Sequence, residues 1–151
     1  MLKEIVEKGF YTFKDSFASW EDAVRGSYEP LQKCKIVDDT YINNVIECVK
    51  KYGPYIVIVP GIAMPHSTEG ADGCYGTAIS FMKVETPVNF DPQDEEKKAT
   101  LFFSLAAMDH EEHLKNIQAL METLMNEDIV EALNQCKTPQ ELKEIADQFE
   151  S

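Results

Sequence analysis

The chain contains 151 residues, of which 44% are hydrophobic and 10% aromatic, and we therefore expect a single domain over residues 1–151 around one core. Its 27 acidic residues outnumber its 14 basic ones and give a formal net charge of −13, which excludes nucleic-acid binding because that function requires a basic face. No apolar run approaches the roughly 18 residues of a membrane-spanning helix, and the polar start does not resemble a secretion signal. We expect a cytoplasmic protein.

Two elements are predicted near the start of the chain. Residues 10–13, Phe-Tyr-Thr-Phe, are strand formers and predict a short strand. Ser19 is followed three residues later by Asp22, a weak form of the helix-capping signal, and apolar residues then recur at helical spacing. We therefore expect a helix over residues 20–32.

A second helix and a buried strand follow. From Asp39 onward, apolar residues recur every three or four positions until Gly53 and Pro54 end the pattern. Residues 55–59, Tyr-Ile-Val-Ile-Val, form a continuous apolar run bounded by prolines, which is typical of a strand buried on both faces. We expect this strand to lie at the centre of the sheet.

The second half of the chain predicts two more strands and then helices. The strands are expected over residues 74–84 and 99–107, with an acidic segment between them that cannot be core. Asp109 and Glu112 can cap one helix, and residues 138–141, Thr-Pro-Gln-Glu, form a capping box with proline at the first helical position. This order of elements favours an α/β layered domain.

The cysteines and histidines give little support for a metal site. Cys34, Cys48, Cys74 and Cys136 contain no Cys-x-x-Cys pair, which argues against a disulfide framework and against zinc. Only His110 and His113, three residues apart, have a recognised metal-ligand spacing. We expect neither a metal nor a cofactor.

His66 is the first candidate for chemistry. It follows the expected strand in residues 59–67, Val-Pro-Gly-Ile-Ala-Met-Pro-His-Ser, where two prolines stiffen the backbone and present the imidazole. Loops at strand ends often carry functional groups. An imidazole with a pKa near ~6.5 can attack an electrophile with one nitrogen while the other holds a hydrogen bond, which suits a phosphoryl acceptor. The alternative is an ordinary loop histidine.

His113 is the second candidate. It lies in the first turn of an expected helix, at the rim of the core, where it can face a neighbouring loop. Helical periodicity does not separate it from His110, which shares a face with the same apolar residues. A surface or capping role remains the alternative for either histidine.

The order of these motifs resembles a known family. Residues 61–66, Gly-Ile-Ala-Met-Pro-His, followed later by His113 and Leu114 at the start of a helix, resemble the enzyme IIA domain of the mannitol–fructose class in the bacterial phosphoenolpyruvate-dependent sugar phosphotransferase system. Residues 20–23 (Trp-Glu-Asp-Ala), 53–58 (Gly-Pro-Tyr-Ile-Val-Ile) and 87–90 (Pro-Val-Asn-Phe) are most similar to its ascorbate-specific branch.

The resemblance implies a fold and a phosphoryl relay. The fold would be a mixed β-sheet flanked by helices. His66 would accept a phosphoryl group on its tele nitrogen from the phosphocarrier protein HPr and pass it to a cysteine of enzyme IIB, which serves the membrane enzyme IIC. His113 would donate a hydrogen bond to the phosphoryl oxygens, with Ser67 and Thr68 as further phosphoryl-binding candidates. The sugar would be ascorbate or a relative, although enzyme IIA does not contact it.

The chain departs from the family in its basic residues. An arginine assists the mannitol proteins, whereas the only arginine here is Arg25, on the first expected helix. Ascorbate-like members often have a basic residue after the histidine, where this chain has Ser67, Thr68 and Glu69. Backbone N–H groups, His113, the two hydroxyls or a lysine brought close by folding would then have to compensate the phosphoryl charge.

Two other functions remain open from the sequence. In a regulatory protein, phosphorylation of His66 would control binding to a target outside transport. In a hydrolase or isomerase, His66 would act as a general base with Asp72 or Asp109, but the chain has no nucleophile elbow and no Gly-rich phosphate loop. The oligomeric state is also left open, since an amphipathic helix can face a core or another subunit.

Overall fold

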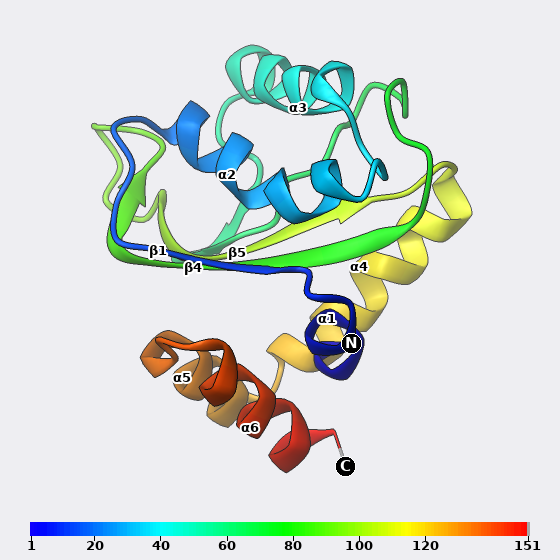
Figure 1. The fold of residues 1–151 in the computed structure, drawn as a ribbon. Helices are drawn as coiled ribbons and strands as arrows, with labels where there is room; N and C mark the ends of the chain where they lie inside the picture. Colours follow the sequence, from blue (N-terminus) through cyan, green and yellow to red (C-terminus); the bar gives the residue numbers. More distant parts are fainter. Residues whose placement is uncertain (151) are drawn as a thin grey trace.

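The computed structural model describes residues 1–150, which form a β-sheet with helices on both faces (Figure 1). The helices are α1 (Leu2–Lys8), α2 (Trp20–Lys33), α3 (Asp39–Tyr52), α4 (His110–Leu124), α5 (Glu127–Gln135) and α6 (Pro139–Phe149). The strands are β1 (Tyr11–Lys14), β2 (Val57–Val59), β3 (Gly61–Ala63), β4 (Ala78–Asn89) and β5 (Lys98–Ala106). Helices α2 and α3 cover one face, and the remaining helices lie on the other (Figure 1).

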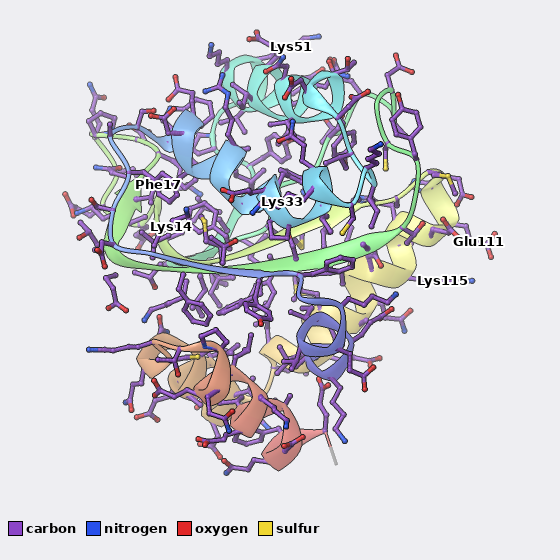
Figure 2. The ribbon with its side chains drawn as sticks, in the orientation of Figure 1. Lys14, Phe17, Lys33, Lys51, Glu111 and Lys115 are labelled. Carbon is purple, nitrogen blue, oxygen red and sulfur yellow. The ribbon has the colours of Figure 1, made fainter. Side chains whose placement is uncertain are left out.

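The sheet is mixed and has the strand order β1-β4-β5-β3-β2. β1 is parallel to β4, β4 is antiparallel to β5, β5 is parallel to β3, and β3 is antiparallel to β2. The predicted α/β layers and the mixed sheet flanked by helices are therefore confirmed. Side chains fill the space between the sheet and the helices on both faces (Figure 2), and Phe81, Phe102 and Phe103 are fully buried at its centre.

The expected central strand over residues 55–59 is wrong. Only Val57–Val59 form a strand, β2, and it lies at the edge of the sheet, where Val59 is 49% exposed. The first two residues of the apolar run form a turn before the strand, and Ile56 is fully buried in that turn. The middle strand is β5, which lies between β4 and β3, and its long antiparallel pairing with β4 forms most of the sheet.

Two further elements were missed by the sequence patterns. Residues 61–63, expected as part of a loop, form strand β3, which pairs with β5. Helix α1 was also not predicted, and its first backbone N–H groups are satisfied from the far end of the chain. The amides of Leu2 and Lys3 donate to the Glu150 carboxylate at 3.0 and 2.9 Å, a contact that has no local signature.

The predicted helix starts are confirmed where a side chain caps them. Ser19, Asp109 and Thr138 each accept a hydrogen bond from the backbone N–H three residues later, at 3.2, 2.9 and 3.1 Å. The N-cap of α3 is Asp38, one residue before the expected start. Within residues 1–150, no helix is long and apolar enough to cross a membrane.

Candidate functional site

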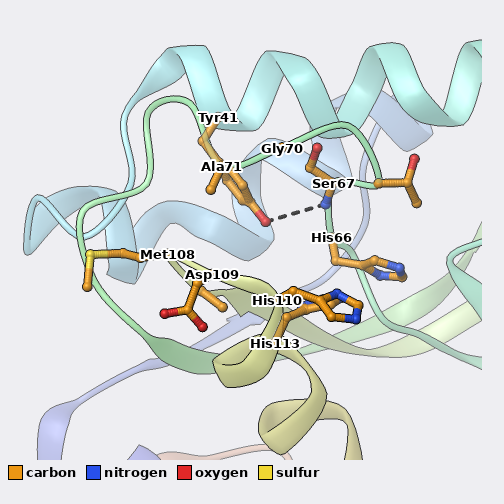
Figure 3. Close-up of a pocket in the computed structure, with 11 residues that line it drawn as sticks. Tyr41, His66, Ser67, Gly70, Ala71, Met108, Asp109, His110 and His113 are labelled. Carbon is orange, nitrogen blue, oxygen red and sulfur yellow. Dashed lines mark hydrogen bonds between the residues drawn. The ribbon is translucent and has the colours of Figure 1, made fainter.

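The topology of the sheet brings His66 and His113 together. His66 lies three residues after the end of β3, and α4, which carries His113, begins shortly after the end of β5. Because β3 and β5 are parallel, their carboxyl ends meet at the same edge of the sheet. The two imidazole rings lie there with centroids 5.2 Å apart and planes inclined by 40° (Figure 3). The pair that the resemblance implied is thus adjacent in space.

The backbone before His66 is held against β5. The Leu105 amide donates to the Pro65 carbonyl at 2.9 Å, and the fully buried Tyr28 hydroxyl lies 2.8 Å from that carbonyl and 2.9 Å from the Leu105 carbonyl. Burial raises the pKa of Tyr28 well above its ordinary value, so the phenol keeps its single proton, which these two oxygens share. Helix α2 thereby fixes the loop that presents His66.

Two more tyrosines hold the backbone at and after His66. The Tyr55 hydroxyl donates to the His66 carbonyl. The Ser67 amide donates to the Tyr41 hydroxyl at 3.3 Å, a contact drawn in Figure 3. Burial raises the pKa of Tyr41 to about 12, which keeps this hydroxyl neutral. No sequence pattern indicated these positioning roles, because the tyrosines belong to the apolar faces of α2 and α3 or to the turn before β2.

We expect Tyr28→Phe to lower the free energy of unfolding by about 1–2 kcal/mol, because two buried carbonyls lose a donor. Urea denaturation of both proteins measures this change. Tyr75→Phe is the matched control, since the Tyr75 hydroxyl contacts Asp38 from a side chain that is 64% exposed. A loss no larger than that of the control would show that Tyr28 does not stabilise the loop.

Among residues 1–150, Nδ1 of His66 has a hydrogen-bond partner and Nε2 has none. Nδ1 lies 2.6 Å from the Met64 carbonyl, and because a carbonyl only accepts, Nδ1 carries the proton. Nε2 therefore keeps its lone pair. Burial lowers the pKa of His66, and the hydrogen bond to Met64 opposes this only in part. His66 is thus a neutral imidazole at physiological pH, with Nε2 as a nucleophile.

His113 is half-buried beside it. Burial is the main cause that lowers the pKa of His113, and the nearby His66 and His110 lower it further. Two groups that both resist protonation can share a confined site without repelling each other. The resting site accordingly holds neutral rings.

The neutral state of these rings predicts how stability depends on pH. A histidine with a lowered pKa binds a proton less readily in the folded protein than in the unfolded chain, whose histidines titrate near ~6.5. The unfolded state therefore binds more protons below that pH, and stability falls as the pH is lowered through this window. We expect the free energy of unfolding to decrease between about pH 7 and 5, and to decrease less in His66→Ala. Equal pH dependence in both proteins would contradict this assignment.

A pocket of about 470 Å³ opens beside His66 and His113. Its lining includes several side chains with polar or titratable groups: Tyr41, Ser67, Thr68, Asp109 and His110. His110, the first residue of α4, is exposed and also borders this pocket. None of the lining residues is a lysine or an arginine.

The other residues considered from the sequence have different places. The Ser67 hydroxyl accepts from the Glu69 amide at 3.2 Å, and the Thr68 hydroxyl contacts the sulfur of Cys48 at 3.6 Å. Asp109 is engaged as the N-cap of α4, whereas Asp72 is absent from the pocket lining. Within residues 1–150, no group of three or more histidine, cysteine or acidic side chains is placed to hold a metal ion.

Comparison with known proteins shows the family to which this chain is similar. The model of the family described as phosphoenolpyruvate-dependent sugar phosphotransferase system, EIIA 2, matches residues 4–148. The ascorbate-specific PTS system EIIA component of Escherichia coli strain K12 is 28% identical over 130 residues, which cover 85% of this chain and 83% of that protein.

Solved structures give the same result. The solution structure of the mannitol-specific cryptic phosphotransferase enzyme IIA from Escherichia coli has a TM-score of 0.84 at 28% identity, covering 97% of this chain and 98% of that one. Enzyme IIA of the mannitol system, in its complex with phosphorylated enzyme IIB from Escherichia coli, has a TM-score of 0.73 at 25% identity, covering 92% and 94%. The chain therefore belongs to the EIIA 2 family of the phosphoenolpyruvate-dependent sugar phosphotransferase system.

Proposed function

We propose that the chain is the enzyme IIA component of a sugar phosphotransferase system, with His66 as its phosphoryl carrier. One observation carries this proposal: Nδ1 of His66 is hydrogen-bonded to the Met64 carbonyl, which leaves the lone pair on Nε2, and His66 lines the same pocket as His113. HPr is the proposed donor and a cysteine of enzyme IIB the proposed acceptor. The proposed location is the cytoplasm, next to the membrane enzyme IIC.

In the first transfer, the Nε2 lone pair of His66 attacks the phosphorus of the phosphohistidine on HPr. A new N–P bond forms while the donor's N–P bond breaks, and its electron pair returns to the HPr imidazole, which leaves as a neutral ring because its other nitrogen keeps its proton. The proton on Nδ1 of His66 does not move. The Met64 carbonyl, 2.6 Å away, stabilises the positive charge that develops on the ring.

In the second transfer, the thiolate of the enzyme IIB cysteine attacks the same phosphorus. A P–S bond forms, the N–P bond breaks, and the electron pair returns to Nε2 of His66. His113, whose ring centroid is 5.2 Å from that of His66, is proposed to donate a hydrogen bond to the phosphoryl oxygens in both steps. Ser67 and Thr68, which border the pocket, are proposed as further donors.

Ascorbate or a related sugar acid is the proposed substrate of the complete system. The curated relatives at 27–28% identity are named as ascorbate-specific EIIA components, which supports transport over a purely regulatory role. The complex of the mannitol enzyme IIA with phosphorylated enzyme IIB supports a matching enzyme IIB as the partner of this chain.

The test reconstitutes the relay from purified proteins. The chain is incubated with phosphoenolpyruvate, enzyme I and HPr, and its mass is followed. We expect one acid-labile phosphoryl group, which is then lost to enzyme IIB of the same operon. If no phosphoryl group is acquired from phosphorylated HPr, the proposed function is wrong; if it is acquired but not passed to any enzyme IIB, the regulatory role replaces transport.

A further inference from the structure

The pocket beside His66 lacks a fixed positive charge. Among the described residues, its lining contains His66, His110 and His113 but no lysine or arginine. The one carboxylate of the lining belongs to Asp109, whose Oδ1 accepts from the Glu112 amide at 2.9 Å. A phosphoryl group on His66 would thus meet no permanently charged side chain that could neutralise it.

Basic side chains of the two neighbouring helices are engaged elsewhere. Lys51 lies on the outer side of α3 (Figure 2) and pairs with Glu69 at 2.8 Å. Arg25 pairs with Asp22 at 3.6 Å along α2. Neither residue borders the pocket, so a cationic side chain within its lining would have to be an imidazole that gains a proton.

His110 and His113 are placed to gain it. They are three residues apart in the first turn of α4, so their side chains share one face of the helix. His113 is half-buried next to His66, and His110 is the exposed residue at the rim. Their rings extend from the start of α4 toward the side of the pocket that His66 occupies (Figure 3), and His110 is close enough to influence the titration of His113.

The charge balance of the transfer defines how much positive charge is needed to neutralise the phosphoryl group. The neutral His66 ring gains a phosphoryl group whose transfer adds one net negative charge: two on the phosphoryl oxygens against one positive charge on the ring. One proton taken up by a neighbouring imidazole restores the original charge. A nearby dianion favours such uptake, because it attracts the positive charge of a protonated imidazole, and this attraction is stronger in a partly buried site than in water.

We propose that His110 and His113 form a proton-binding pair that takes up one proton from solvent when His66 is phosphorylated and hydrogen-bonds the phosphoryl oxygens in place of a fixed cation. The inference rests on the proposed function of His66 and extends the site to His110. The proton is released again when the phosphoryl group passes to its acceptor. Acceptance and release of phosphate are thereby coupled to a proton.

Other titratable groups around the pair do not supply this proton-binding capacity. These groups belong to the elements packed around the pair. They are Tyr41 on α3, Tyr55 before β2, His66 after β3, Cys74 before β4, Asp109 at the start of α4 and Glu112 on α4. Burial raises the pKa of both tyrosines and of the Cys74 thiol, so these groups stay protonated throughout. The Asp109 carboxylate accepts from the Glu112 amide, and the Glu112 carboxylate accepts from the Thr77 hydroxyl. The imidazoles of His110 and His113 are therefore the groups that can take up a proton when His66 is phosphorylated.

The first measurement follows the imidazoles directly. The full chain has three histidines, and their ¹⁵N signals can be assigned with His110→Gln and His113→Gln. With phosphoenolpyruvate, enzyme I and HPr keeping His66 phosphorylated at pH 7.5, we expect the signals of His110 and His113 to move toward those of a protonated ring. The pKa of His113 is expected to rise by about one or more.

The second measurement is the equilibrium of phosphoryl exchange between HPr and the chain, between pH 8 and 6. We expect the wild-type chain to hold the phosphoryl group roughly 3- to 10-fold more strongly than His110→Gln at pH 6, with a smaller difference at pH 8. The contribution of HPr cancels in this comparison. Glu111→Gln is the control, because Glu111 is exposed on the same turn outside the pocket and pairs with Lys115.

The outcomes separate this inference from the proposed function. If His66 is phosphorylated while both signals stay those of neutral imidazole, proton uptake is wrong and the carrier function stands. If only His113 responds and His110→Gln matches wild type at every pH, His110 does not belong to the site. If His66 acquires no phosphoryl group at all, both proposals fall together.

Discussion

His66→Ala is expected to abolish phosphoryl acceptance completely, the largest effect of any substitution in this chain. The methyl group of alanine has no lone pair, so the nucleophile is lost rather than weakened. The other two imidazoles are not expected to replace it, because they lie on α4, whereas the loop that carries residue 66 is held in place through its backbone by Tyr28, Tyr41 and Tyr55. Mass measurement after incubation with phosphoenolpyruvate, enzyme I and HPr is the assay.

Two controls make this result specific. The thermal unfolding of His66→Ala should remain cooperative, because the ring is only partly buried and the tyrosine contacts are made to backbone atoms. Cys34→Ser, an exposed site distant in sequence, should be phosphorylated like the wild type. A phosphoryl group found on a folded His66→Ala protein would refute His66 as the acceptor.

The second largest effect is expected for His113→Ala. We expect onward transfer to enzyme IIB to slow by roughly 100-fold, which is the usual cost of removing one donor that stabilises charge in a transition state. Acceptance from HPr should be partly kept, because Nε2 of His66 and its bond to Met64 are unchanged. Single-turnover transfer from the phosphorylated chain to enzyme IIB measures the rate.

His113→Gln distinguishes hydrogen bonding from charge. The glutamine amide can donate to a phosphoryl oxygen but cannot take up a proton. Its transfer rate should therefore lie between those of alanine and wild type and should lose the pH dependence that a titrating imidazole gives. If His113→Ala transfers in both directions at the wild-type rate, His113 has no part in the site.

The sequence predicted the elements whose signals are local. The helices that begin after Ser19, Asp109 and Thr138 were found because a side chain caps a backbone N–H within the same turn. Helix α1 was missed for the opposite reason, since its first amides, those of Leu2 and Lys3, donate to the carboxylate of the distant Glu150. A seven-residue helix has little intrinsic stability, so this distant contact contributes to its formation.

The position of a strand in the sheet was less accessible. Residues 55–59 have the apolar composition of a central strand, yet Val57–Val59 lie at the edge. The apolar composition of a segment indicates that its side chains are buried, but not in which element. Ile56 is buried, but it lies in the turn before β2. Which strands become neighbours depends on pairing between distant segments, and periodicity within one segment does not encode it.

For the site, the sequence by itself determined His66 and its local geometry. The prolines that stiffen residues 60–65 and the Met64 carbonyl, two residues away, act within the loop. Only the tertiary structure decided that His113 and His110 share a pocket with His66 and that, within the described part of the chain, no lysine or arginine lines it. The physical reason is that the parallel pairing of β3 with β5 sets both strand ends at one edge of the sheet, and such pairing is a property of the whole fold.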